Sequence, residues 1–275
     1  MFYGEKKEFK DITVVVYPSY KKFLPLYNGQ FDCLIQDECD LLLSDEFRRL
    51  TILTKAQYKY WLTWTPYNDS FKREDMWLRR GRIVEAKTYN EWLKNQFDYE
   101  IYGVETGDEV EEYEHYRDLK HTINGQKSKL DAIKFCIEQW LIKGKRVLVM
   151  TDTKDFTNKI WEELWYATMT GDMSKKERTL MFEKFDSTKV LCAIGQLIWR
   201  WYDNPEIDVI VIAFSWRAES PILQSVGRWL RSSPGKDKVV VYDIYSPTKM
   251  MKYQWYKRKT YYEQFTKDIQ NIRFK

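Results

Sequence analysis

A regular alternation of short apolar runs and helical patterns over residues 128–245 constrains the fold more than any other feature of the chain. The apolar runs, rich in Val and Ile, fall at residues 147–150, 190–194, 207–213 and 238–244. Apolar residues recur at helical spacing between them, which predicts helices over 128–141, 155–166, 174–185 and 219–231. Ser174, with Glu177 three residues later, matches a helix-capping box. Strands that alternate with helices build βαβ units, so we expect an α/β protein with a doubly wound parallel sheet.

The N-terminal part of the chain predicts a smaller unit of the same kind. Residues 12–17 (ITVVVY) and 31–36 (FDCLIQ) are short apolar runs, which we expect to be strands buried on both faces. Residues 46–62 are mixed and predict a helix followed by a strand. That strand ends at residues 63–66 (TWTP), because the proline stops regular structure. Two or three strands are too few for a complete domain of this class.

These patterns divide the chain into four segments. We expect a partial α/β domain at 1–66, a charged connector with some helix around 88–97 at 67–124, a complete α/β domain at 125–247, and a basic aromatic helix at 248–275. The last segment carries eight Lys and Arg residues against two acids, in a chain whose formal net charge is only +4. Its Lys257 and Arg258 are therefore the best electrostatic candidates for contact with a phosphate backbone.

Composition excludes several classes of protein. With 44% hydrophobic and 31% charged residues, 11 Gly and 7 Pro, the chain is typical of a folded protein and not of a low-complexity one. The four cysteines form no CxxC pair, which indicates neither a disulfide framework nor a zinc site. The N-terminus is charged, and no apolar run approaches the ~20 residues that span a bilayer. We therefore expect a cytoplasmic protein with no membrane partner.

An acidic cluster, Asp37-Glu38-Cys39-Asp40, directly follows one of the predicted strands. Ligands of α/β sheets bind at the carboxyl ends of strands. Two adjacent carboxylates at such a point can hold Mg²⁺ through water and polarise an attacking water. An ordinary acidic turn would give the same pattern, so the cluster alone leaves both interpretations open.

A basic constellation occupies residues 224–231 (QSVGRWLR). On a helix, Gln224, Arg228 and Arg231 fall on one face, and two guanidinium groups one turn apart suit contact with phosphate oxygens. Arginines so placed can stabilise the charge that develops on a transferred phosphoryl group. A solvated basic helix is the alternative reading of the same residues.

Together, and in this order, the two constellations resemble motifs II and VI of superfamily 2 helicases and translocases. The motif VI pattern QxxGRxxR is matched at each fixed position by residues 224–231, and residues 37–40 are similar to the Walker B element of the DEAD/DEAH group. Other stretches resemble further motifs of the family: 16–19 (VYPS) the segment ahead of motif II that touches nucleic acid, 63–66 motif III, 147–151 motif IV, and 170–178 the TG…R segment. The run VVVYDIY at 239–245 and the basic tail are typical of the UvsW-like phage branch.

The resemblance implies RecA-like parallel sheets, with a complete C-terminal helicase domain and a partial N-terminal one. It also implies ATP and Mg²⁺ as cofactors. Asp37 would hold the metal through water, Glu38 would polarise the attacking water, and Arg228 and Arg231 would act as arginine fingers. Further nucleotide contacts are implied for Asp40, Asp203, Gln224 and Gly227. Contacts with nucleic acid, DNA rather than RNA, are implied for Tyr17, Ser19, Thr63, Thr65, Thr151, Gly171, Arg178, Lys257 and Arg258.

Motif V departs from the family pattern. The stretch 195–205 keeps Asp203 and Pro205, but Gly195 stands where the family has Thr and Trp201 where it has Gly. A Trp cannot replace Gly where the backbone must approach a ligand closely. The change argues against the coupling of nucleotide to nucleic acid that motif V provides in the family.

The larger departure concerns the phosphate-binding loop. The pattern GxxxxGK[ST], whose backbone N–H groups and Lys hold the β- and γ-phosphates, does not occur in the 275 residues. We therefore expect little or no ATPase activity from this chain alone. Since unpaired apolar strands invite pairing with another chain, we expect one of three states: a partner polypeptide completes the N-terminal domain and supplies the loop, the half-domain packs on something else, or the chain is a degenerate relative. The alternative is an ATP-independent pseudo-helicase that binds nucleic acid or a replication or recombination protein.

Overall fold

The chain divides into two compact units, residues 1–84 and 85–275, and each is described by itself. In the computed structural model the description covers all residues except 1, 4–5, 8–9, 38–50, 63–97, 108, 111–112, 114, 196, 199–203, 205, 216–235, 237, 264–265 and 275. No described helix is both long and apolar enough to cross a membrane.

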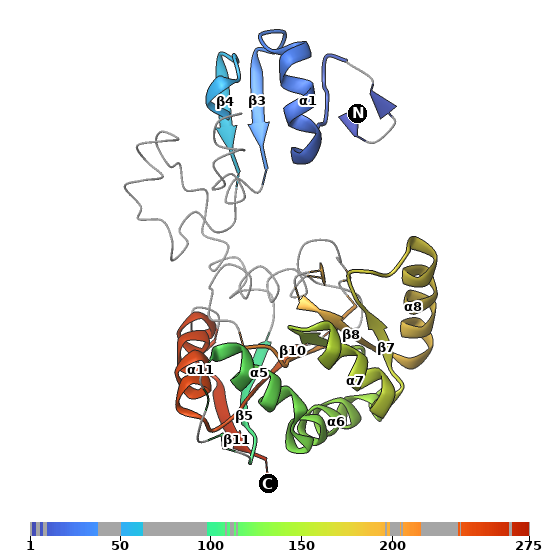
Figure 1. Ribbon diagram of the computed structural model, residues 1–275, viewed down its shortest axis with the longest axis vertical. Coiled ribbons are helices and arrows are strands. Elements are labelled where there is room, and N and C mark those ends of the chain that lie inside the picture. The colour runs from blue at the N-terminus through green and yellow to red at the C-terminus, as the bar shows by residue number, and fades with distance from the viewer. Residues whose placement is uncertain are drawn as a thin grey trace. The chain divides into compact units, whose positions relative to one another are not determined.

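The second unit is built on a seven-stranded sheet in the order β11-β5-β10-β9-β6-β8-β7 (Figure 1). Its strands are β5 (Asp98–Glu105), β6 (Val147–Thr151), β7 (Ala167–Met169), β8 (Val190–Ile194), β9 (Val209–Ile212), β10 (Lys238–Tyr245) and β11 (Ile269–Arg273). Every neighbouring pair runs parallel. The α/β fold class with a parallel RecA-like sheet is therefore confirmed.

Helices cover both faces of this sheet. They are α5 (Tyr116–Gly125), α6 (Lys127–Leu141), α7 (Lys154–Leu164), α8 (Lys175–Thr188) and α11 (Lys249–Tyr262). On β6, Val149 belongs to the apolar cluster shared with α6 and α7, whereas Met150 belongs to the cluster shared with α8 and α11. Successive residues of a strand point to opposite faces, so a strand covered on both sides must be apolar throughout. This requirement explains the continuous Val and Ile runs of the central strands.

The predicted connector at 67–124 and the predicted helical tail at 248–275 are wrong in part. Residues 98–105 form β5, which pairs with β10 over eight residues, and α5 follows at 116–125. After α11 the chain forms β11, which pairs with β5. Both missed strands carry polar residues among apolar ones (DYEIYGVE and IQNIR), so their composition resembles a charged linker. Their pairing with the sheet outweighs that local character.

The first unit contains a short parallel sheet and one long helix. Its elements are β1 (Phe2–Tyr3), β2 (Lys6–Lys7), α1 (Tyr17–Tyr27), β3 (Cys33–Gln36) and β4 (Tyr58–Trp61). Strands β3 and β4 are parallel and pair Cys33 with Tyr58 and Ile35 with Tyr60. Leu34, on the opposite face, packs against the Tyr20–Leu24 part of α1.

The predicted strand at 12–17 is wrong. Within this run only Val15 makes a β-bridge, Ile12 is 88% exposed, and Tyr17 is already the first residue of α1. β-branched residues form a strand only where a neighbouring strand and a covering surface are available. Pro18, with its fixed φ and no N–H, suits the first turn of a helix and starts α1 instead. The expectation that β3 is buried on both faces is also wrong, because Cys33 and Ile35 are exposed.

Candidate functional site

The parallel sheet of the second unit brings the carboxyl ends of all its strands to one edge, which is where α/β proteins bind ligands. Polar or small residues follow the strands at this edge: Thr106 after β5, Asp152 after β6, Thr170 after β7, Gly195 after β8, Ser215 shortly after β9, and Ser246 after β10. The segments that resemble motif IV and the TG…R element lie here. This edge is therefore the candidate functional site of the second unit.

At the end of β6 the structure corrects one predicted contact. Thr151 is fully buried, and its hydroxyl lies 2.6 Å from the Thr157 hydroxyl and donates to the Ala193 carbonyl at 3.2 Å. Its side chain joins β6 to α7 and β8, so it is not available to nucleic acid. The hydroxyl that the resemblance assigns to a ligand is used inside the fold.

A buried polar network follows directly after Thr151. The Asp152 carboxylate pairs with Lys120 Nζ at 3.0 Å and accepts from Asn124 Nδ2 at 3.1 Å. Asn124 in turn accepts from Lys129 Nζ at 2.6 Å, and burial lowers the pKa of Lys129 to about 8. The network ties α5 and α6 to the end of β6. This network was not predicted from the sequence. The signal was the position of Lys129, which lies four residues before Ile133 and therefore on the apolar face of its helix.

The TG…R segment forms an exposed turn between β7 and α8. Arg178 donates from Nη2 to the Gly171 carbonyl at 3.2 Å, and both residues are exposed. Asp172 accepts from Lys154 at 2.5 Å and from Thr170 at 2.7 Å, and these bonds lower its pKa to about 2. The turn therefore carries two cations and one fixed carboxylate at the sheet edge. The predicted roles of Gly171 and Arg178 stay predictions that this exposure allows.

In the first unit, Asp37 directly follows β3 and is exposed. The Tyr17 hydroxyl donates to the Asp37 carbonyl, and thus ties the start of α1 to the acidic turn. Next to it, Trp61 Nε1 donates to the Gln36 side chain at 2.7 Å, and the Leu62 N–H donates to the Gln36 carbonyl at 2.9 Å. The described residues that lead into the two motif-like segments, Gln36 and Asp37 on one side and Trp61 and Leu62 on the other, therefore lie side by side. Ser19, half-buried on the first turn of α1, donates its backbone N–H to the Val16 carbonyl.

Several predicted site residues lie outside the described part of the chain. They are Glu38, Asp40, Thr63, Thr65, Asp203, Gln224, Gly227, Arg228 and Arg231. Their assignments stay predictions.

The tail residues Lys257 and Arg258 have opposite environments. Lys257 is exposed, whereas Arg258 is 1% exposed and donates to Asp243 from Nε at 2.7 Å and from Nη2 at 2.6 Å. Tyr262 donates to the same carboxylate at 2.8 Å. The predicted contact of Arg258 with nucleic acid is wrong, because its guanidinium neutralises a carboxylate inside the core. A charged residue within the apolar run VVVYDIY was the signal that such a partner is needed.

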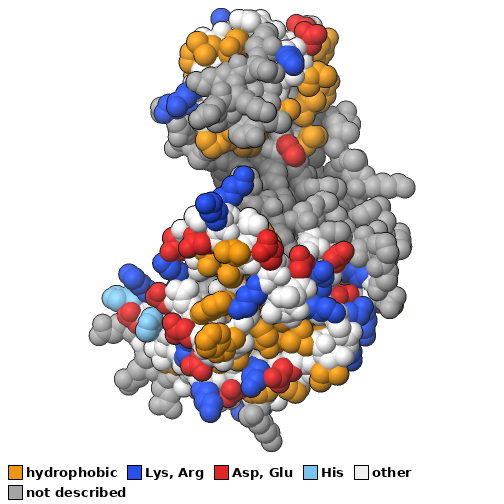
Figure 2. Space-filling view, turned by 90° about the vertical axis from the view of Figure 1, so that its right-hand side faces the viewer, with side chains coloured by type: hydrophobic (Ala, Val, Ile, Leu, Met, Phe, Trp, Pro, Cys, Tyr) orange, Lys and Arg blue, Asp and Glu red, His pale blue; other side chains and the backbone are white. Residues whose placement is uncertain are grey.

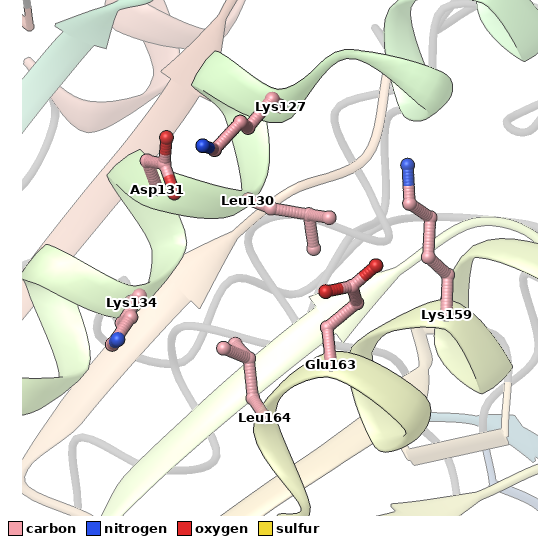
Figure 3. Close-up of a pocket in the computed structure, with 7 residues that line it drawn as sticks. All are labelled: Lys127, Leu130, Asp131, Lys134, Lys159, Glu163 and Leu164. Atoms are coloured by element: carbon pink, nitrogen blue, oxygen red, sulfur yellow. The ribbon is translucent and has the colours of Figure 1, made fainter.

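A surface groove of about 320 Å³ lies between α6 and α7 (Figure 3). It is formed by residues of α6 and α7: Lys127, Leu130, Asp131, Lys134, Lys159, Glu163 and Leu164. The lysines and acids of this set surround Leu130 and Leu164 on two facing helices, as Figure 3 shows. Charges of both signs at its rim select no particular ligand.

Comparison with known proteins agrees with this geometry. Residues 128–233 match the helicase conserved C-terminal domain family. This stretch of the chain is therefore similar to a helicase C-terminal domain. The matched segment begins in α6 and extends over the QSVGRWLR stretch, and it includes the four strands β6 to β9, whose carboxyl ends contribute to the edge described above. A search of curated proteins found no match.

Solved helicase structures share the fold at low identity. S. cerevisiae Dbp5 bound to RNA and ADP BeF3 is 15% identical, with a TM-score of 0.58 over 88% of this chain and 59% of that one. T4 UvsW is 14% identical, with a TM-score of 0.50 over 93% and 57%. The Type ISP restriction-modification enzyme LlaBIII bound to DNA is 14% identical, with a TM-score of 0.66 over 94% and 23%. The chain thus shares the fold of these proteins and spans less than two thirds of the length of each.

Proposed function

We propose that this chain is the C-terminal portion of an ATP-dependent superfamily 2 DNA helicase or translocase that works with a separately supplied P-loop. The observation that carries the proposal is the helicase C-terminal domain match over 128–233, which includes the complete QxxGRxxR pattern. The polar and small residues at the carboxyl ends of the matched strands also support it, because α/β proteins bind ligands at that position. A binding module would not need the two arginines of this pattern in addition to the acidic turn at Asp37.

The chemistry divides between this chain and its partner. Asp37 is an exposed carboxylate at a strand end, which fits a Mg²⁺ ion that keeps most of its water ligands, and Glu38 would polarise the attacking water. Arg228 and Arg231 would stabilise the transferred phosphoryl group, with Asp40, Asp203, Gln224 and Gly227 as further nucleotide contacts. When bound, Mg²⁺–ATP supplies the phosphoryl group and neutralises charge on it. Asp37 of this chain therefore fits the role of a metal ligand. The chain does not fit the role of binding the β- and γ-phosphates, because the GxxxxGK[ST] pattern is absent.

Nucleic acid would bind along the strand ends of both units. The candidates are Tyr17, Ser19, Thr63 and Thr65 in the first unit, and Gly171, Arg178 and Lys257 in the second. Resemblance to the phage branch favours DNA over RNA. Among the relatives reported above, one is bound to RNA and another to DNA.

One face of the β3–β4 sheet is exposed among the described residues, and this supports a partner polypeptide. Ile35, Tyr58 and Tyr60 share this face and are 63%, 51% and 54% exposed. Parallel sheets occur almost only with both faces covered, and a two-stranded sheet alone is marginal. Hydrophobic side chains are also visible on the outer surface of this unit in Figure 2. A second α/β polypeptide with the P-loop would cover this face.

ATP hydrolysis with and without a P-loop partner tests the proposal. We expect negligible Mg²⁺-dependent turnover by the purified chain with single-stranded DNA. We expect turnover when it is co-expressed with a P-loop polypeptide from a neighbouring reading frame, and loss of that turnover in Arg228→Ala. Ile35→Asp with Tyr60→Asp should prevent complex formation, whereas Trp165→Asp, at an exposed site of the second unit, should not.

Two outcomes would contradict the proposal. Robust turnover by the chain alone, abolished by Arg228→Ala, would show that no separate P-loop is needed. A stable complex that binds DNA without any ATP hydrolysis would establish the ATP-independent alternative, which the missing P-loop and the altered motif V favour.

A further inference from the structure

Helix α11 has one face in the core and one face in solvent. Its inward residues, Met251, Gln254, Trp255, Arg258, Tyr261 and Tyr262, are buried. In Figure 1 the helix runs beside β5 and β11 at the side of the second unit. The inward face is therefore fully used in packing, and only the outward face is available for binding.

The outward face combines aromatic rings with positive charge. Lys249, Tyr253, Tyr256 and Lys257 are exposed and fall at i, i+4, i+7 and i+8, so they form one stripe. Tyr253 and Tyr256 are 51% and 59% exposed, and Lys257 Nζ lies 5.9 Å from the Tyr253 ring centroid. The helix sequence, KMMKYQWYKRKTYY, contains no acidic residue. We refer to these four residues as the α11 stripe.

We propose that the α11 stripe binds single-stranded polynucleotide, with Tyr253 and Tyr256 stacking on bases and Lys249 and Lys257 contacting phosphates. The inference rests on the proposed function, to which it adds a binding surface outside the motifs. Lysines without intervening acids select a polyanion, and exposed rings between them suit ligands with free aromatic faces. Bases of a duplex are stacked on one another and leave no such face. The occupant is therefore a single strand and not a duplex.

The arrangement of the stripe argues against a purely structural role. Tyr261 and Tyr262 lie between one and two turns beyond Tyr256 on the same helix and are buried, so other tyrosines of this helix do pack into the core. Tyr253 and Tyr256 are kept in solvent instead. Lys252, at the margin of the stripe, pairs with Glu105 at 3.2 Å and holds the helix against β5.

Equilibrium binding without nucleotide tests the inference. A fluorescein-labelled single-stranded DNA of mixed sequence is titrated with the full chain, and the same sequence as RNA and as duplex DNA is titrated in parallel. We expect Tyr253→Ala with Tyr256→Ala to weaken single-strand binding by at least about 25-fold, since each lost stack costs about fivefold or more. Lys249→Gln with Lys257→Gln should lower the slope of log K against log salt by ~0.7 for each phosphate contact.

Matched control variants test whether weaker binding is specific to the α11 stripe or follows from any loss of exposed charge or aromatic side chain. Lys127→Gln with Lys134→Gln removes the same charge from the exposed surface of α6, and Tyr113→Ala removes an exposed tyrosine that lies outside α11. Both controls should bind like the unchanged chain. Equal weakening by the controls, or unchanged binding by the Tyr253 and Tyr256 variant, would overturn the inference. Tighter binding of duplex than of single strand would overturn it as well.

The design also distinguishes this inference from the proposed function. Arg178→Ala reports the contact proposed at the sheet edge. Loss of binding in Arg178→Ala with unchanged binding in the tyrosine variant would refute the α11 stripe alone. ATP turnover of the complex is measured separately and does not enter this test. The DNA and RNA arms decide which polynucleotide is preferred.

Discussion

Replacing Arg258 with Ala should unfold the second unit more readily than any other single change in α11. Asp243 lies on β10 and is completely buried, and Arg258 supplies its two charged hydrogen bonds. The variant leaves this carboxylate without its counter-ion inside the core, where water cannot replace it. Burial, together with the Asp243 charge, raises the pKa of Tyr262 well above its ordinary value, so that hydroxyl stays a donor. One neutral donor cannot compensate for the lost guanidinium.

The expected loss is large because it reflects an unpaired buried charge. Removing one partner of a buried ion pair costs about 3–5 kcal/mol. With a urea dependence of about 2–3 kcal/mol/M, the unfolding midpoint should fall by about 1–2.5 M. Replacing the exposed neighbour, Lys257→Ala, should cost about 0.5 kcal/mol or less. Two neighbouring cations in the sequence should therefore differ severalfold in how much their removal lowers the free energy of unfolding.

Urea unfolding followed by circular dichroism measures both variants. A triple variant, Asp243→Leu with Arg258→Met and Tyr262→Phe, removes every member of the group and should recover most of the loss, because an apolar replacement leaves no orphaned charge. Failure of the triple variant to recover would point to lost packing instead of lost charge. A cost below about 1 kcal/mol for Arg258→Ala, with weakened DNA binding equal to that of Lys257→Ala, would refute the buried placement of Arg258.

Three further changes test other parts of the second unit by the same unfolding assay. A Cβ on Gly103 would lie 2.2 Å from the Trp255 ring, so Gly103→Ala should cost about 1–3 kcal/mol, and less when Trp255→Leu makes room. The folded pKa of Lys129 is about 8 and its unfolded pKa is near 10.5, so between these values only the unfolded chain holds the proton and stability rises with pH. Relative to Lys129→Met, the chain should therefore gain about 2–3 kcal/mol between pH 8 and pH 10, and parallel pH profiles would contradict this. Ser174→Ala removes a capping box shared with Glu177 and should cost about 1 kcal/mol, and no change would show that α8 does not depend on its cap.

The strands that sequence patterns predict well are those with two covered faces. The strands β8 and β9 are apolar at every position, and β6 and β10 depart from this only at Thr151, Lys238 and Asp243, because helices pack on both sides of these strands. β5 and β11 lie toward the edge of the sheet, and their alternating polar residues resemble a linker. The apolar run at 12–17 shows the opposite failure, since strand propensity without a neighbouring strand did not produce a strand. In all three segments, strand formation depended on pairing with residues far apart in the sequence, which local patterns do not reveal.

The candidate site was predictable in position but not in side-chain direction. Placing the motif segments at strand ends needs only the order of strands and loops, and Asp37, Gly171 and Arg178 do lie at such points. Thr151 and Arg258 were assigned to a ligand from residue type, yet both point into the protein. For Arg258 the period of α11 places it on the apolar face with Trp255 and Tyr262. Charge counts along a segment do not separate such a residue from its exposed neighbours.

The two units differ in how completely each covers its own sheet, and this difference bears on function. The helicase C-terminal domain match ends at residue 233, but the sheet of the second unit is completed by β10, β5 and β11 outside that range. Within the described residues this unit buries both sheet faces, so it can fold without a partner. The first unit leaves Ile35, Tyr58 and Tyr60 of its parallel sheet exposed. Covering that face would bury apolar surface that a parallel sheet ordinarily hides, and this gain in free energy would accompany delivery of the phosphate cradle to Asp37.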